Sequence, residues 1–79
     1  MATYPTVALQ PSQTYNEQAK QLQQYLVSQG YMTQAEMDAG PGYYGPRTTA
    51  AVTKLQQKLG VDVAGYPGYW GPKTLAKLG

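Results

Sequence analysis

An internal repeat constrains this chain more than any other feature of its sequence. The segment Pro41-Gly-Tyr-Tyr-Gly-Pro-Arg-Thr48 recurs as Pro67-Gly-Tyr-Trp-Gly-Pro-Lys-Thr74, with every position matching by identity or by chemical type. Upstream, Leu22-Gln-Gln-Tyr-Leu26 recurs as Leu55-Gln-Gln-Lys-Leu59. Such self-similarity indicates one structural unit used twice. Each unit reads as a helix, a loop, an aromatic turn and the start of the next helix, so the two units share the central helix.

The first helix is predicted over residues 15–29. Thr14 and Glu17 have the spacing of a capping box, in which a hydroxyl and a carboxylate satisfy backbone donors at a helix start. Gly30 supplies the C-terminal stop. Apolar residues recur at helical spacing along one face, which consists of Tyr15, Ala19, Leu22 and Leu26. The opposite face carries Gln18, Gln21 and Gln24 and is expected to be solvated.

Two further helices are predicted to begin at proline. Pro46 and Pro72 suit the first position of a helix, where the missing N–H costs nothing. The helix from Pro46 ends at Gly60, and a short one follows Pro72. Loops are expected at 39–45 and 61–71, and a capping box of Thr33 and Glu36 predicts a brief helical turn through Asp38. The inward-facing residues are Thr48, Val52, Leu55, Leu59, Leu75 and Leu78. The expected fold class is a small all-α, three-helix bundle built from a duplicated helix-loop-turn unit.

The length of 79 residues allows one small domain. A chain of this size buries only about 60–65% of the surface that its unfolded form exposes, which leaves little room for an enclosed active site. Residues 1–14, with Pro5 and Pro11, are predicted to form an extended segment, and residues 15–79 the domain itself.

Composition excludes several classes of function. The chain has no Cys and no His, which removes thiolate chemistry, the commonest general base and the commonest metal ligand. The only close carboxylates are Glu36 and Asp38, and Glu36 is better explained as a capping residue. We therefore expect no enzyme activity, no cofactor and no metal. A net charge of +2 is too weak for nucleic acid. No apolar run approaches the roughly 20 residues of a membrane helix. The N-terminus lacks the pattern of a signal peptide. The protein is expected to be a monomer.

The ordered motifs resemble the type 1 peptidoglycan-binding domain family. That family combines a Leu-Gln-x-x-Leu helix ending in Gly-Tyr, an aromatic Gly-Pro-x-Thr turn followed by Ala-Val and a second Leu-Gln, and a second Gly-Pro-x-Thr turn. The matching residues cover about 15–78 and are Ala19, Leu22, Gln23, Leu26, Gly30, Tyr31, Tyr44, Gly45, Pro46, Thr48, Ala51, Val52, Leu55, Gln56, Gly60, Trp70, Gly71, Pro72, Thr74 and Leu78. The chain departs from the family in lacking Asp before Gly in both turns and in a longer second loop.

The resemblance implies a three-helix fold and non-covalent binding of bacterial peptidoglycan. Such modules usually accompany a wall-lytic enzyme, such as the hydrolases of endolysins, and work at the cell wall outside the cytoplasm. A different class of function stays open: a protein-interaction or assembly module that docks a partner through its Tyr-rich turns, since Tyr is common at protein interfaces.

Two kinds of residue in the turns are candidates for ligand contact. The family pattern points Tyr44 and Trp70 inward, which leaves Tyr43 and Tyr69 to face solvent, where flat rings can stack on sugars or on stem-peptide methyl groups. A structural role is the alternative for all four aromatic residues, and Tyr31 either lines the same surface or closes the core.

Arg47 and Lys73 each occupy the first turn of a helix, where a cation is mildly unfavourable. Breaking a local rule twice hints at function, and a cation beside exposed N–H groups can bind a carboxylate of the stem peptide. The alternative for both is an ordinary solvated side chain. Thr48 and Thr74 are expected to be structural.

Overall fold

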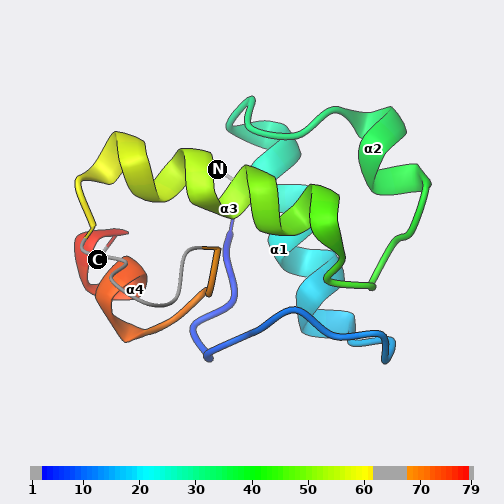
Figure 1. Cartoon of the computed structure of the whole chain (residues 1–79), viewed down its shortest axis with the longest axis horizontal. Helices are drawn as coiled ribbons and strands as arrows, with labels where there is room; N and C mark the ends of the chain where they lie inside the picture. Colours follow the sequence, from blue (N-terminus) through cyan, green and yellow to red (C-terminus); the bar gives the residue numbers. More distant parts are fainter. Residues whose placement is uncertain (1–2, 62–67, 79) are drawn as a thin grey trace.

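The computed structural model describes residues 3–61 and 68–78, and within those ranges its secondary structure is helical, with no strand (Figure 1). The helices are α1 (Glu17–Ser28), α2 (Gln34–Asp38), α3 (Pro46–Leu59) and α4 (Pro72–Leu78). Three longer helices and one brief helical turn, α2, confirm the predicted all-α class. The predicted loop at 61–71, Pro67 of the second repeat included, falls largely on residues 62–67, which lie outside the described residues.

The start of α1 corrects one prediction. Its N-cap is Asn16, whose Oδ1 accepts a hydrogen bond from the Gln18 amide at 2.8 Å. The proposed capping box of Thr14 and Glu17 is wrong, because the Glu17 carboxylate instead accepts a hydrogen bond from the Tyr15 hydroxyl at 2.6 Å. Tyr15 consequently precedes the helix and is 47% exposed, so its assignment to the apolar face is also wrong.

The other helix boundaries follow their predicted signals. Thr33 and Glu36 form the capping box of α2. Pro46 is the first residue of α3, which ends at Gly60 in the left-handed conformation with φ +72°. Gly30, just beyond α1, likewise has φ +85°. Glycine adopts this backbone conformation without the steric cost that a Cβ brings.

The core lies where α1 packs against α2 and α3, and α3 against α4. The predicted inward faces are confirmed: Thr48 is buried with the apolar residues of α1 and α3, while Leu59, Leu75 and Leu78 are partly buried against them. Gln18, Gln21 and Gln24 are exposed, as predicted. The buried apolar residues are Leu9, Ala19, Leu22, Tyr25, Leu26, Met32, Met37, Tyr44, Ala51, Val52, Leu55 and Trp70.

The segment 3–16, which we call the strap, runs along the lower side of the molecule in Figure 1 and joins the same core. Leu9 and Trp70 exchange two backbone hydrogen bonds, of 2.7 and 3.0 Å, in an isolated antiparallel bridge. Farther along, the Ser12 amide donates to the Tyr44 carbonyl at 3.0 Å. The strap therefore supplies backbone partners to both repeated segments. No helix among the described residues is long and apolar enough to span a membrane.

Candidate functional site

Two buried glutamines hold the repeated turns in the same way. We call residues 41–45 the first turn and residues 68–71 the second turn. Gln23 of α1 accepts a hydrogen bond from the Gly42 amide at 2.8 Å, and its Nε2 lies 3.0 Å from both the Tyr43 carbonyl and the Thr48 hydroxyl. The first turn is thus fixed to α1 and to the start of α3 through one side chain.

Gln56 of α3 repeats this arrangement at the second turn. Its Oε1 accepts from the Gly68 amide at 3.0 Å, and its Nε2 donates to the Tyr69 carbonyl at 2.7 Å and to the Thr74 hydroxyl at 3.0 Å. Among the described residues, no buried side-chain nitrogen or oxygen lacks a hydrogen-bond partner. A satisfied buried amide rigidifies its surroundings, and both threonines serve a structural role as expected.

Tyr44 and Trp70 both point into the protein. Tyr44 is 2% exposed and donates its hydroxyl hydrogen bond to the Gly68 carbonyl, while Trp70 is 0% exposed and donates from Nε1 to the Pro5 carbonyl at 3.0 Å. This burial confirms their inward direction. Because neither ring is accessible to a ligand, we remove both from the candidate contact residues and assign them to holding the turns.

Tyr43 and Arg47 lie together on the surface beside the first turn. They line a shallow hollow of about 180 Å³, which is also bordered by Glu36 of α2 and by the buried Gln23 and Thr48. Tyr43 is 46% exposed, as predicted, and Arg47 is also exposed. The hollow thus presents one aromatic ring, one guanidinium and one carboxylate to solvent.

A second exposed ring, that of Tyr15, stands beside Tyr43. The two ring centroids are 5.7 Å apart in an edge-to-face arrangement, with an interplanar angle of 75°. The Tyr15 ring also covers the first turn, because a Cβ at Gly42 would lie only 2.6 Å from its Cδ2. Sequence reasoning missed Tyr15 as a surface residue because its spacing from Ala19 and Leu22 fits a helical face.

The second turn presents its candidates differently. Lys73 is exposed, whereas Tyr69, which is predicted to face solvent, is only partly exposed. Its ring lies over Gly71, where a Cβ would come within 2.9 Å of the Tyr69 Cδ2. Tyr31 is partly buried and packs against the core. None of these three residues lines the hollow that holds Tyr43 and Arg47.

The charge of Glu36 is stabilised locally. The backbone amide and the hydroxyl of Thr33 both donate to its Oε1, at 3.0 and 3.1 Å, and these hydrogen bonds lower the pKa of the carboxyl below its ordinary value of 4.5. Lys54 and Arg47 add a smaller effect in the same direction. Glu36 therefore carries a negative charge at neutral pH beside the Arg47 guanidinium.

The described residues contain no group of three or more His, Cys, Asp or Glu side chains that could hold a metal ion. The site that they do form combines rings, a cation and backbone turns, which suits non-covalent contact.

Comparison with known proteins gives one family. A family model described as "Putative peptidoglycan binding domain" matches residues 15–78. No curated protein and no solved structure matches the chain. The match begins at Tyr15 and leaves most of the strap outside it.

Proposed function

The chain belongs to the family of peptidoglycan-binding domains, and from that premise we propose that it binds peptidoglycan non-covalently through the face formed by Tyr15, Tyr43 and Arg47. The observation that carries this proposal is the placement of Tyr43 and Arg47 around one hollow beside the first turn. Family membership supports cell-wall association, and the chain contributes binding rather than catalysis.

Each group on this face has a matching partner in the wall polymer. The exposed rings of Tyr15 and Tyr43 can lie against the apolar face of a sugar or against a stem-peptide methyl group. The Arg47 guanidinium can pair with a stem-peptide carboxylate in a forked geometry, which strengthens the hydrogen bonds. Tyr69 and Lys73 offer the same two chemistries at the second turn.

We further propose that the module concentrates an attached or associated wall-lytic enzyme on its substrate. A module with a small contact surface binds weakly alone, but tethering and the repetition of the ligand raise the effective affinity by about 10²–10⁴-fold. The place of action is then the bacterial cell wall.

A pull-down with purified, protein-free sacculi tests the binding. The chain is expected to co-sediment, and both Tyr43→Ala and Arg47→Glu are expected to reduce the retained fraction while leaving the melting temperature within a few degrees of the parent. Lys58→Glu makes the same change of charge at the other end of α3 and serves as the matched control.

If the chain does not co-sediment with sacculi, the function proposed here is wrong and a module that docks a protein partner takes its place. If Tyr43→Ala binds as the parent does, the binding face lies elsewhere on the domain.

A further inference from the structure

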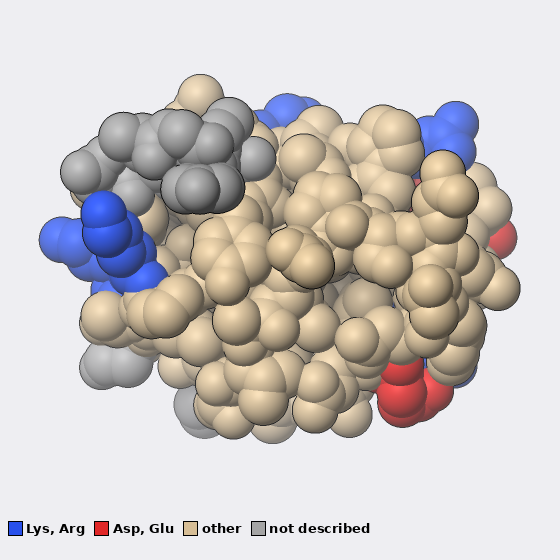
Figure 2. Space-filling view, turned by 60° about the horizontal axis from the view of Figure 1, so that its bottom comes forward, with Lys and Arg blue, Asp and Glu red and all other residues tan. Residues whose placement is uncertain are grey.

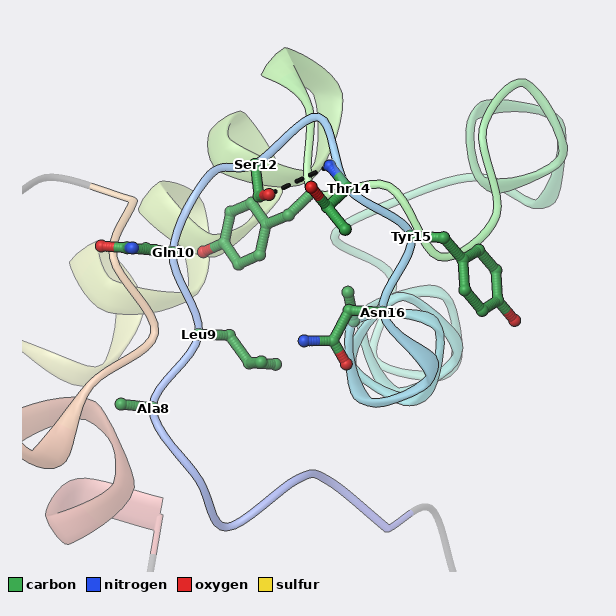
Figure 3. Close-up of a pocket in the computed structure, with 9 residues that line it drawn as sticks. Ala8, Leu9, Gln10, Ser12, Thr14, Tyr15 and Asn16 are labelled. Carbon is green, nitrogen blue, oxygen red and sulfur yellow. Dashed lines mark hydrogen bonds between the residues drawn. The ribbon is translucent and has the colours of Figure 1, made fainter.

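A second pocket lies between the strap and the start of α1, partly outside the segment that matches the family (Figure 3). Its volume is about 270 Å³. The residues lining it are Ala8, Leu9, Gln10, Ser12, Thr14, Tyr15, Asn16, Ala19 and Tyr44. Figure 3 shows the side chains of Leu9 and Asn16 pointing toward each other across the pocket, while the Tyr15 ring turns outward.

The lining of this pocket combines small apolar groups with neutral hydrogen-bonding groups. Ala8, Leu9 and Ala19 supply the apolar part. Among the described residues that line it, none carries a formal charge. The hydrogen bond at the helix start uses only the Oδ1 of Asn16, so its Nδ2 can donate to a ligand. The Thr14 backbone amide donates to the Ser12 Oγ at 3.0 Å. The Thr14 hydroxyl is available as a second donor to a ligand.

The surface around the strap has the same neutral character. Figure 2 turns the lower side of Figure 1, where the strap lies, toward the reader. Uncharged side chains fill the centre of this face, and the Lys, Arg, Asp and Glu groups that it shows stand at its margins. The face differs from the hollow at Tyr43, which Arg47 and Glu36 border with opposite charges. A neutral ligand group therefore fits the strap pocket, and a charged group that can pair with Arg47 or Glu36 fits the hollow.

We propose that the strap pocket receives the acetamido group of an N-acetylated amino sugar. This inference rests on the proposed function and assigns the glycan strand to the strap and the stem peptide to the hollow. An acetamido group has a methyl, a carbonyl that accepts from Asn16 Nδ2 or the Thr14 hydroxyl, and an N–H that donates. The pocket, at about 270 Å³, has room for such a group.

Two neutral oligosaccharides of equal length form the matched pair of probes. Chitotetraose carries an acetamido group where cellotetraose carries a hydroxyl. Titration of the labelled full chain with millimolar chitotetraose is expected to shift the backbone amide signals of Ala8 and Leu9 and the side-chain NH2 signals of Asn16. Cellotetraose at the same concentrations is expected to leave them in place. Equal shifts with both sugars overturn the acetamido assignment.

Two conservative substitutions test the donors. Asn16→Asp keeps the oxygen that caps α1, since Asp and Asn cap helices equally well, but it removes the Nδ2 donor. Thr14→Val removes a hydroxyl and keeps the shape. Each is expected to weaken chitotetraose binding about 2- to 10-fold, the range of one lost hydrogen bond of roughly 0.5–1.5 kcal/mol. Gln13→Ala, a change in the strap at a residue that does not line this pocket, is the control and is expected to leave the affinity unchanged.

The outcomes separate this inference from the function on which it rests. Retention on sacculi without any chitotetraose shift at the strap overturns the sugar pocket and leaves the wall-binding proposal standing. Failure to bind sacculi overturns both. Shifts at Ala8 and Asn16 with a free stem peptide, but not with chitotetraose, place the peptide in the pocket and overturn the glycan assignment.

Discussion

The phenol of Tyr44, in the first turn, donates a hydrogen bond to the backbone carbonyl of Gly68, in the second turn. The two copies of the repeat are therefore tied to each other through one buried side chain. The strap adds further links to both turns: the Ser12 amide donates to the Tyr44 carbonyl, and Leu9 pairs with Trp70. A change at any of these contacts is expected to affect both turns.

Burial of Tyr44 predicts a loss of stability in alkali. Burial raises the pKa of its hydroxyl above the ordinary value of 10.0. A raised pKa means that the unfolded chain releases this proton at a lower pH than the folded chain does. The stability that the Tyr44 hydroxyl contributes is therefore complete below pH 10 and is lost as the pH rises further. The free energy of unfolding is expected to fall above pH 10, and to fall less steeply in Tyr44→Phe. Urea unfolding at pH 8 to 11 measures this.

The same variant checks the hydrogen bond at neutral pH. Tyr44→Phe leaves the buried Gly68 carbonyl without its partner, which costs about 1–3 kcal/mol. Tyr43→Phe removes a hydroxyl from the exposed neighbouring ring. Its free energy of unfolding is expected to match that of the parent at neutral and at alkaline pH. An unchanged free energy of unfolding in Tyr44→Phe contradicts the link between the turns.

The hydrogen bonds that Gln23 and Gln56 make to the two turns predict large and similar losses of stability when either glutamine is replaced. Gln23→Leu and Gln56→Leu each strip hydrogen bonds from a buried turn amide and from a threonine hydroxyl, so each is expected to cost at least about 2 kcal/mol. Gln24→Leu and Gln57→Leu alter the neighbouring exposed residues and are expected to stay within about 0.5 kcal/mol of the parent. Denaturant midpoints of the four variants compare them directly. Similar midpoints for all four contradict the role of Gln23 and Gln56 in holding the turns.

The repeat predicted the architecture well because it marks the contacts that each unit makes with itself. Leu22-Gln-Gln and Leu55-Gln-Gln, followed by two copies of the same turn, place the helices and their stops correctly, apart from the start of α1. The inward direction of Tyr44 and Trp70 followed from the family pattern rather than from periodicity, since two adjacent aromatic residues give no helical spacing to separate them.

The start of α1 and the features that depend on contacts across the chain were not predictable in this way. Tyr15 fits the apolar spacing of α1, but Asn16 competes successfully for the cap and leaves Tyr15 outside the helix. Tyr43 and Tyr69 are equivalent in the repeat, yet they differ in exposure because each ring meets a different neighbour. The position of the strap, which fixes Leu9 against Trp70, has no counterpart in the repeat at all.

Gly42 is predicted to tolerate a side chain less well than Gly30. Both have positive φ, +83° and +85°, so alanine carries the same backbone penalty of roughly 1–2 kcal/mol at either site. Only at Gly42 does the added Cβ collide with the Tyr15 ring, whereas nothing lies within 4 Å of it at Gly30. Thermal unfolding is expected to place Gly42→Ala clearly below Gly30→Ala, with altered ring-proton shifts for Tyr15. Equal melting temperatures contradict the contact between the ring and the turn.

The charge of Glu36 predicts a mild acid sensitivity of α2. Because hydrogen bonds from Thr33 lower the pKa of this carboxyl below 4.5, its stabilising contribution is present above that pH and is lost as the pH falls through the lowered value. Amide exchange in α2 is expected to accelerate below pH 4.5, after correction for the intrinsic rate. Glutamine also suits the third position of a capping box, so Glu36→Gln should keep the helix and remove the pH dependence. The same acceleration in Glu36→Gln assigns the effect to another group.

Leu9 is predicted to couple the strap to the only tryptophan of the chain. Its side chain is buried and its backbone is paired with Trp70, so Leu9→Ala is expected to cost about 2–5 kcal/mol, as is usual for truncating a buried leucine. Val7→Ala shortens an exposed side chain of the same strap and is the matched control. Tryptophan fluorescence followed through urea unfolding reports both the midpoint and the wetting of the Trp70 indole. A lower urea midpoint and a red-shifted native fluorescence spectrum are expected for Leu9→Ala alone. Water then reaches the Trp70 indole, which the strap otherwise covers. Parent-like behaviour of Leu9→Ala contradicts the strap as part of the folded core.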